Sequence, residues 1–175
     1  EWGLAVSAEK RLADNYRDHN NSDTESVNFE VGRSFTNGRV WLELSRSSEL
    51  QLLPGALFST EYAANRKASR NTSDFLDGQY RSYRGGLNVA LSQHWHLELD
   101  ITNRIDDIDG SQVAFGSASA TRQERAQSSV NPRLIGRFSQ SNGDMIITTG
   151  FDYDDADYFL SSVFGVQQAQ QQIQS

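Results

Sequence analysis

Cysteine is absent from this sequence of 175 residues, so disulfides and thiolate metal sites are both excluded. Hydrophobic residues are scarce as well, since they make up 37% of the chain and its mean hydropathy is −0.62. No stretch approaches the run of roughly 20 apolar residues that a membrane-spanning helix needs. This excludes helical membrane proteins but leaves open the barrels whose strands place only alternate residues on lipid.

Basic residues are also few: 16 Lys and Arg stand against 23 Asp and Glu, which gives a net charge of −7. Because phosphate binding needs a basic stripe, we expect no nucleic-acid partner. The chain opens without a signal peptide, directly on apolar residues that alternate from Trp2 onward. Either the protein is cytosolic or the sequence is an internal piece of a longer protein, and the early alternation favours the piece.

What the sequence does contain is a repeated hairpin pattern. Residues 25–47 alternate between apolar and polar side chains on both sides of Asn37-Gly38. Period-two alternation marks a strand with two different faces. Asn-Gly between two such runs predicts a type I′ turn, which needs positive φ at both central residues. The pattern recurs at 81–102 and, less cleanly, at 131–154.

Short turns and long connections alternate along the chain. The short turns lie near 36–38, 92–93 and 139–143, and the long polar segments lie at about 11–24, 51–78 and 106–123. In an antiparallel up-and-down meander, all the short turns then fall at one end of the strands and all the long loops at the other. Outer-membrane barrels have this asymmetry, and soluble sandwiches have no reason for it.

We therefore predict an all-β fold in which residues 1–175 form a single segment of a transmembrane outer-membrane β-barrel. The expected strands, about seven in number, lie near 2–10, 25–35, 39–48, 79–91, 94–104, 126–138 and 144–155. The side chains expected to face lipid are Phe29, Val31, Leu42, Leu44, Leu87, Val89, Leu97 and Leu99. Those expected on the polar face are Asn28, Glu30, Glu43, Glu98 and Asp100.

Aromatic residues near the predicted strand ends suit the interfacial girdle of a membrane barrel. They are Trp2, Tyr83, Trp95 and Tyr153. The alternative is that aromatic residues are simply good strand formers. Trp41 falls on the polar face and does not fit the girdle.

The segment ELQLLPGALFSTEYAANRKASRN, residues 49–71, combines a strand, Leu-Pro-Gly, a short helix with Ser59 as the expected N-cap, and Ala-Asn-Arg. It resembles a loop in the first third of the barrel of TonB-dependent outer-membrane receptors. The segment at 131–158 resembles a later hairpin of the same branch, and the whole resemblance covers roughly residues 1–160. Such transporters use barrels of about 22 strands, so seven strands form only part of one. The plug domain, the TonB box and the remaining strands are not in this sequence.

The resemblance implies an active-transport receptor of the bacterial outer membrane. Such a receptor captures a scarce ligand, for instance a ferric siderophore, and imports it with energy from the TonB complex, which acts through the plug domain. Its surroundings are outer-membrane lipid and lipopolysaccharide. Two alternatives remain: a porin-like or adhesive barrel without energy coupling, and a soluble β-sandwich binding module whose apolar face packs on a second sheet.

Loop 51–78 is the expected ligand-binding segment. It carries basic and aromatic side chains, which suit an anionic ligand that bears rings. The residues expected to contact the ligand are Tyr62, Arg66, Arg70 and Phe75. The alternative is a solvated loop whose charges keep it soluble.

No motif points to catalysis, a metal or a cofactor. The segment GSASA at 116–120 is not the Gly-x-Ser-x-Gly nucleophile elbow. The acidic run 106–109 lacks the ligand spacing of a calcium loop, and His94 and His96 lack a third ligand. We expect no enzyme activity, no metal site and no cofactor.

Overall fold

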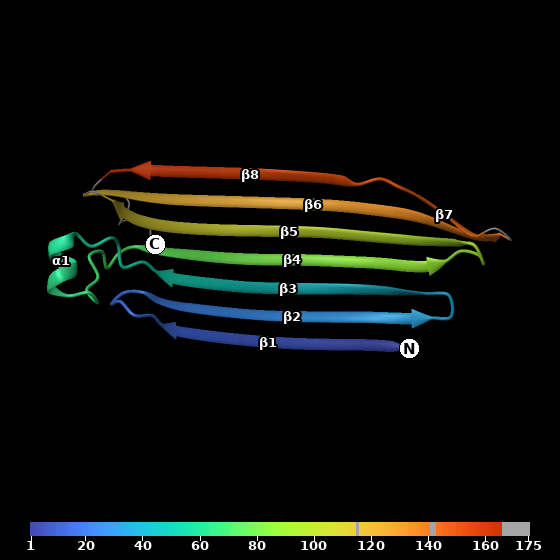
Figure 1. Ribbon diagram of the computed structural model, residues 1–175, viewed down its shortest axis with the longest axis horizontal. Coiled ribbons are helices and arrows are strands. Elements are labelled where there is room, and N and C mark those ends of the chain that lie inside the picture. The colour runs from blue at the N-terminus through green and yellow to red at the C-terminus, as the bar shows by residue number, and fades with distance from the viewer. Residues whose placement is uncertain (115, 141–142, 166–175) are drawn as a thin grey trace.

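The computed structural model describes residues 1–114, 116–140 and 143–165. Figure 1 shows strands lying side by side in one sheet, with one short helix at the end where the long connections lie. The strands are β1 (Trp2–Asp14), β2 (Asn21–Phe35), β3 (Gly38–Leu52), β4 (Phe75–Ala90), β5 (Trp95–Ala114), β6 (Ser117–Gln140), β7 (Gly143–Gly150) and β8 (Tyr153–Phe164); the helix is α1 (Ser59–Ala64). Each strand from β1 to β6 pairs antiparallel with the next, and β8 also pairs antiparallel with β6. The all-β antiparallel meander predicted from the sequence is confirmed.

Strands β7 and β8 occupy one position in the sheet, because both pair with β6 in one continuous register. Arg133 pairs with Gly150, and Val130 pairs with Tyr153. The two pairs are three residues apart on both sides of the ladder, so the register does not shift between β7 and β8. Between them lies Pro132, whose carbonyl accepts a hydrogen bond from the Phe151 N–H at 3.3 Å. Proline has no N–H to return that bond, so the ladder is interrupted there. The described strands therefore occupy seven positions in the sheet, the number that the sequence predicts.

The prediction of a long polar loop at 106–123 is wrong. Strand β5 continues to Ala114 and β6 begins at Ser117, and Asp107 pairs with Glu124 inside the ladder. The alternation of apolar and polar residues ends near Ile105, because charged residues then occupy both faces of β5 at Asp106 and Asp107. A strand that is polar on both faces has no period-two signal.

The other long connections are also shorter than predicted. The segment between β1 and β2 is 15–20 instead of 11–24, and the one between β3 and β4 is 53–74 instead of 51–78. The last strand also extends past its predicted end at 155, to Phe164.

The first hairpin turn differs from the predicted type I′ turn. Phe35 pairs with Gly38, so the connecting residues are Thr36 and Asn37, and neither Asn37 nor Gly38 is among the described residues with positive φ. Gly38 is instead required by close packing, because a Cβ there would lie 2.2 Å from the Asn88 carbonyl oxygen on β4. The third turn, at 141–142, lies outside the described residues.

The strand register confirms the two predicted faces. Val31 pairs with Leu42, and Leu87 pairs with Leu99, so these side chains lie on one face. On the other face Glu30 pairs with Glu43. We call the apolar set the apolar band; it comprises Leu4, Val6, Phe29, Val31, Leu42, Leu44, Leu87, Val89, Leu97, Leu99, Ile101 and Leu134.

The apolar band is not covered by a second layer in the described part of the chain. Leu4 is 69% exposed, Val6 is 65% exposed and Leu42 is 43% exposed. A contiguous exposed apolar surface of this kind marks a place for lipid or another apolar partner. The second sheet that the β-sandwich alternative requires is not among the described residues.

Helix α1 is six residues long and lies in the β3–β4 loop. Its N-cap is Phe58 rather than the predicted Ser59, and the Phe58 N–H donates to the Glu61 carboxylate at 2.8 Å. A carboxylate at the third helical position satisfies one of the free N–H groups of the first turn. None of the helices that the structure describes has the length and apolar character needed to cross a membrane.

Candidate functional site

Three connections meet at the long-loop end of the sheet, on the left of Figure 1: segment 15–20, segment 53–74 with α1, and the β5–β6 turn. The Asp18 N–H donates to the Lys67 carbonyl at 2.7 Å, which joins the first two segments. Within segment 53–74, the Arg70 N–H donates to the Pro54 carbonyl at 2.9 Å and draws its two ends together. These loops form one folded unit.

Asp74 is the polar centre of this unit and is 1% exposed. One carboxylate oxygen accepts from the Asn71 side-chain amide at 2.8 Å, and the other accepts from the Val113 N–H at 3.0 Å. Its backbone carbonyl accepts from the Leu53 N–H at 2.9 Å and lies 2.9 Å from Nε2 of His19. Asp74 therefore joins segment 15–20, segment 53–74 and the end of β5, and every oxygen that it buries has a partner.

Arg17, in the β1–β2 connection, holds the β3–β4 loop by hydrogen bonds to three backbone carbonyls. Its Nη1 donates to the Gly55 carbonyl at 2.7 Å, and its Nη2 donates to the Ala68 carbonyl at 2.9 Å and to the Pro54 carbonyl at 3.4 Å. The planar guanidinium can do this because its five N–H groups form a rigid fork. Segment 53–74 is thus closed onto the β1–β2 loop.

We expect Arg17→Lys to loosen segment 53–74, because one ammonium group cannot replace donors that reach three carbonyls. The loss should be about 1–3 kcal/mol of local stability, the usual cost of hydrogen bonds left unmade at a charged donor. Hydrogen exchange of the amides between Leu53 and Asp74 measures it. The matched control is Arg11→Lys, since Arg11 is exposed and its ion-pair partner among the described residues is Glu9, at 2.9 Å. Equal exchange in the two variants would contradict the expectation.

The four residues predicted from the sequence to contact a ligand lie in three different places in the structure. Tyr62 is 51% exposed on α1, and the Arg66 guanidinium lies 5.1 Å from its ring centroid. Arg70 lies 3.8 Å from the ring centroid of Phe58, with its Nε 3.9 Å from a Glu61 oxygen. Phe75, the fourth, begins β4 and lines a separate groove on the apolar-band face.

A cavity of about 430 Å³ lies between the β3–β4 loop and the β5–β6 turn. Its lining combines apolar groups with one guanidinium and two amides: Leu57, Phe58, Arg70, Asn71, Gln112 and Val113 are among the residues that form it. The sequence did not identify Phe58 as a site residue, because nothing in its spacing or its neighbours distinguishes it from the other apolar residues of the loop. Its contact with Arg70 makes it part of the candidate site.

The polar face carries a second cluster, near the short-turn half of the sheet. Arg84 lies between Asp100, at 3.3 Å, and Glu43, at 3.9 Å, and its guanidinium is 5.3 Å from the Trp41 ring. The Trp41 ring covers Gly86, where a Cβ would come within 2.3 Å of it. Trp41 therefore packs on the polar face against a cross-strand glycine, which gives its position a structural reason independent of the predicted girdle.

The histidines and acidic runs are not arranged as a metal site. Across the described ranges, no group of three or more His, Asp and Glu side chains is placed to hold a metal ion. His94 instead stacks on Phe138, with ring centroids 5.3 Å apart.

No family model matches the chain, and no curated protein matches its sequence. Among solved structures, the ferric citrate transporter FecA in its unliganded form superposes with a TM-score of 0.86 at 13% sequence identity. The match covers 97% of this chain and 26% of FecA. The fold is that of an outer-membrane β-barrel segment. At this identity the likeness shows the fold alone, and the chain spans about a quarter of the length of the transporter that it matches.

Proposed function

We propose that this chain is part of the barrel wall of an active-transport receptor in the bacterial outer membrane. The receptor captures a scarce iron chelate, such as a ferric siderophore, and imports it with energy from the TonB complex. The observation that carries the proposal is the superposition of almost the whole chain on a ferric citrate transporter. The uncovered apolar band supports a membrane location, because it offers lipid a contiguous apolar face.

The partners follow from this location. Lipid acyl chains contact the apolar band, and lipopolysaccharide surrounds the end of the sheet that bears the long loops. The TonB complex acts through a plug domain that is not in this sequence. The long loops face the outside of the cell, as the longer loops of outer-membrane barrels do.

The ligand contacts are assigned to the folded loops. Arg66 over Tyr62 and Arg70 over Phe58 present two positive charges on aromatic rings at the outer end of the sheet. This combination suits an anionic chelate with planar groups, because the guanidinium binds carboxylate or phenolate oxygens and the ring packs on the ligand. Phe75 lies elsewhere and is considered below.

The test is binding of radiolabelled ferric citrate and of hydroxamate and catecholate iron chelates to cells that carry the full receptor. We expect Arg66→Ala combined with Arg70→Ala to weaken binding of the recognised chelate about 10- to 100-fold, which corresponds to about 1.5–3 kcal/mol for a lost charged hydrogen bond. Arg33→Ala is the matched control, since Arg33 lies 5.3 Å from the Trp2 ring at the opposite end of the sheet.

Point substitutions test the site better than deletion of residues 58–75. That deletion also removes Asp74, so it would disrupt the loops whether or not they bind a ligand. Unchanged binding in the Arg66 and Arg70 variant would leave the loop with a structural role only. Failure of the unmodified receptor to bind any of the three chelates would favour the porin-like or adhesive barrel.

A further inference from the structure

Charged side chains follow the apolar band on the same face of the sheet, toward the long-loop end. On β5, Ile101 and Ile105 are followed at alternate positions by Asp107 and Asp109. Their cross-strand neighbours are charged or polar as well. We call this set the charged rim; on strands β4, β5 and β6 it comprises Asp77, Arg81, Asp107, Asp109, Arg122 and Glu124.

The charged rim marks where the hydrocarbon layer ends. A lysine or arginine on the lipid face of an outer-membrane barrel costs about 2–4 kcal/mol at the midplane and about 0–1 kcal/mol near the interface. Several such groups together are therefore stable only outside the hydrocarbon. The rim then lies at the level of the lipid headgroups, directly above the apolar band.

Four of the six charges of the rim form ion pairs within it. Arg81 donates to Asp107, and Arg122 Nε donates to Glu124 at 2.7 Å. The hydrogen bond to Glu124, with the charges of Asp109 and Asp107, raises the pKa of Arg122 above its ordinary value. Two shielded polar atoms without a hydrogen-bond partner among the described residues, Arg81 Nε and Asp23 Oδ1, also lie on this face.

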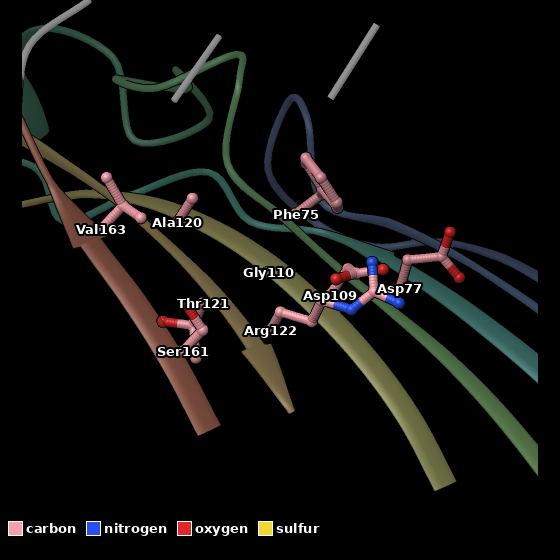
Figure 2. Close-up of a pocket in the computed structure, with 9 residues that line it drawn as sticks. All are labelled: Phe75, Asp77, Asp109, Gly110, Ala120, Thr121, Arg122, Ser161 and Val163. Atoms are coloured by element: carbon pink, nitrogen blue, oxygen red, sulfur yellow. The ribbon is translucent and has the colours of Figure 1, made fainter. Parts of the chain in front are cut away.

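A groove of about 350 Å³ opens into the rim. Phe75 and Val163 form its apolar end, and Asp77, Asp109, Arg122 and Ser161 supply the polar groups. Figure 2 shows the Arg122 side chain extending across the sheet toward Asp109 and Asp77, with the Phe75 ring above them. Carboxylates, a guanidinium and a hydroxyl thus line the same recess as an aromatic ring.

This lining fits a sugar better than it fits a phosphate. Sugar hydroxyls donate to carboxylates and accept from a guanidinium, so both signs of charge are used. The aromatic ring offers a flat apolar surface to the C–H face of a sugar. A phosphate would lie beside Asp77 and Asp109, whose two negative charges outnumber that of Arg122 and repel it.

We propose that this groove binds a sugar of the lipopolysaccharide core oligosaccharide, next to the lipid whose acyl chains contact the apolar band. The inference rests on the membrane location in the proposed function, and it assigns one of the partners named there to particular residues. The source of the sugar follows from continuity, because the groove adjoins the apolar band on the same face of the same strands. Phe75 then contacts the glycolipid rather than the iron chelate.

The experiment measures binding of fluorescent lipopolysaccharide by the full chain folded in detergent micelles. We expect lipopolysaccharide with a complete core oligosaccharide to bind at least 10-fold more tightly than lipid A, which lacks the core. The double variant Asp109→Asn, Arg122→Gln should lose this difference. The matched control is Asp100→Asn, Arg84→Gln, which changes a similar pair on the opposite face and should keep it.

Equal binding of lipid A and complete lipopolysaccharide by the unmodified chain would overturn the proposal, and so would an unchanged preference in the groove variant. If the groove variant does not fold, competition by free core oligosaccharide on the unmodified chain decides: displacement supports a sugar site, and no displacement rejects it. The assay contains no iron chelate. A receptor that binds no chelate but prefers the complete core would therefore refute transport and leave this inference standing.

Discussion

Replacing Asp74 with alanine should lower the free energy of unfolding by about 2–4 kcal/mol, because it leaves buried donors without an acceptor. The Val113 N–H and the Asn71 amide both donate to the Asp74 carboxylate, which is 1% exposed. Removing it also leaves the Asn71 amide, which donates to the Val113 carbonyl at 2.8 Å, as the remaining side-chain hydrogen bond between the β3–β4 loop and Val113 of β5 among the described residues. Denaturant titration measures the global loss, and hydrogen exchange at the Val113 amide measures the local one.

The control for Asp74 is Asp77→Ala, three residues further along the chain. Asp77 lines the groove of the charged rim. Among the described residues, its carboxylate accepts neither a backbone N–H nor a side-chain amide, whereas that of Asp74 accepts both. We expect a change within about 0.5 kcal/mol, as for most surface substitutions. Similar losses in the two variants would show that the buried network does not hold the loops.

A charge in the middle of the apolar band should have an effect of similar size. Leu97 lies on β5. Leu97→Arg places a guanidinium beside its cross-strand partners, Val89 on β4 and Leu134 on β6. If this face contacts lipid, the substitution costs about 2–4 kcal/mol near the midplane. Urea titration of the chain in phospholipid vesicles measures the difference.

His96→Arg is the matched control for Leu97→Arg. His96 is the preceding residue, is exposed, and lies on the polar face. The same guanidinium should be nearly neutral there. Equal costs at both positions would remove the reason to place the apolar band in lipid, and so would a chain that stays folded and monomeric in buffer without detergent.

The sequence predicted those parts of the fold in which the two faces of a strand differ. Phe29 and Val31 alternate with polar residues, so the pattern identified the strand and both of its faces. The same reasoning failed for the outer half of β5, where Asp106 and Asp107 point to opposite faces and both are charged. Strand continuation there depends on pairing with β4 and β6, which no local pattern reports.

The candidate site was harder to predict than the sheet. Arg17 contacts Ala68, 51 residues further along the chain, and Asp74 contacts Val113, 39 residues further along. Neither contact leaves a trace in spacing or composition. The sequence did locate the loop that carries Tyr62, Arg66 and Arg70, because basic and aromatic residues gather there, but not which arginine packs on which ring.

The odd number of strand positions limits how this sheet can close into a barrel. Strands β1 and β8 form the two edges and run in the same direction, from the short turns to the long loops (Figure 1). Setting β8 of one copy beside β1 of an identical upright copy would therefore create a parallel seam. Antiparallel contact between copies requires one of them to be inverted, with its long loops on the opposite side of the membrane. A closed barrel that is antiparallel throughout and keeps its long loops on one side must therefore complete this sheet with an odd number of different strands.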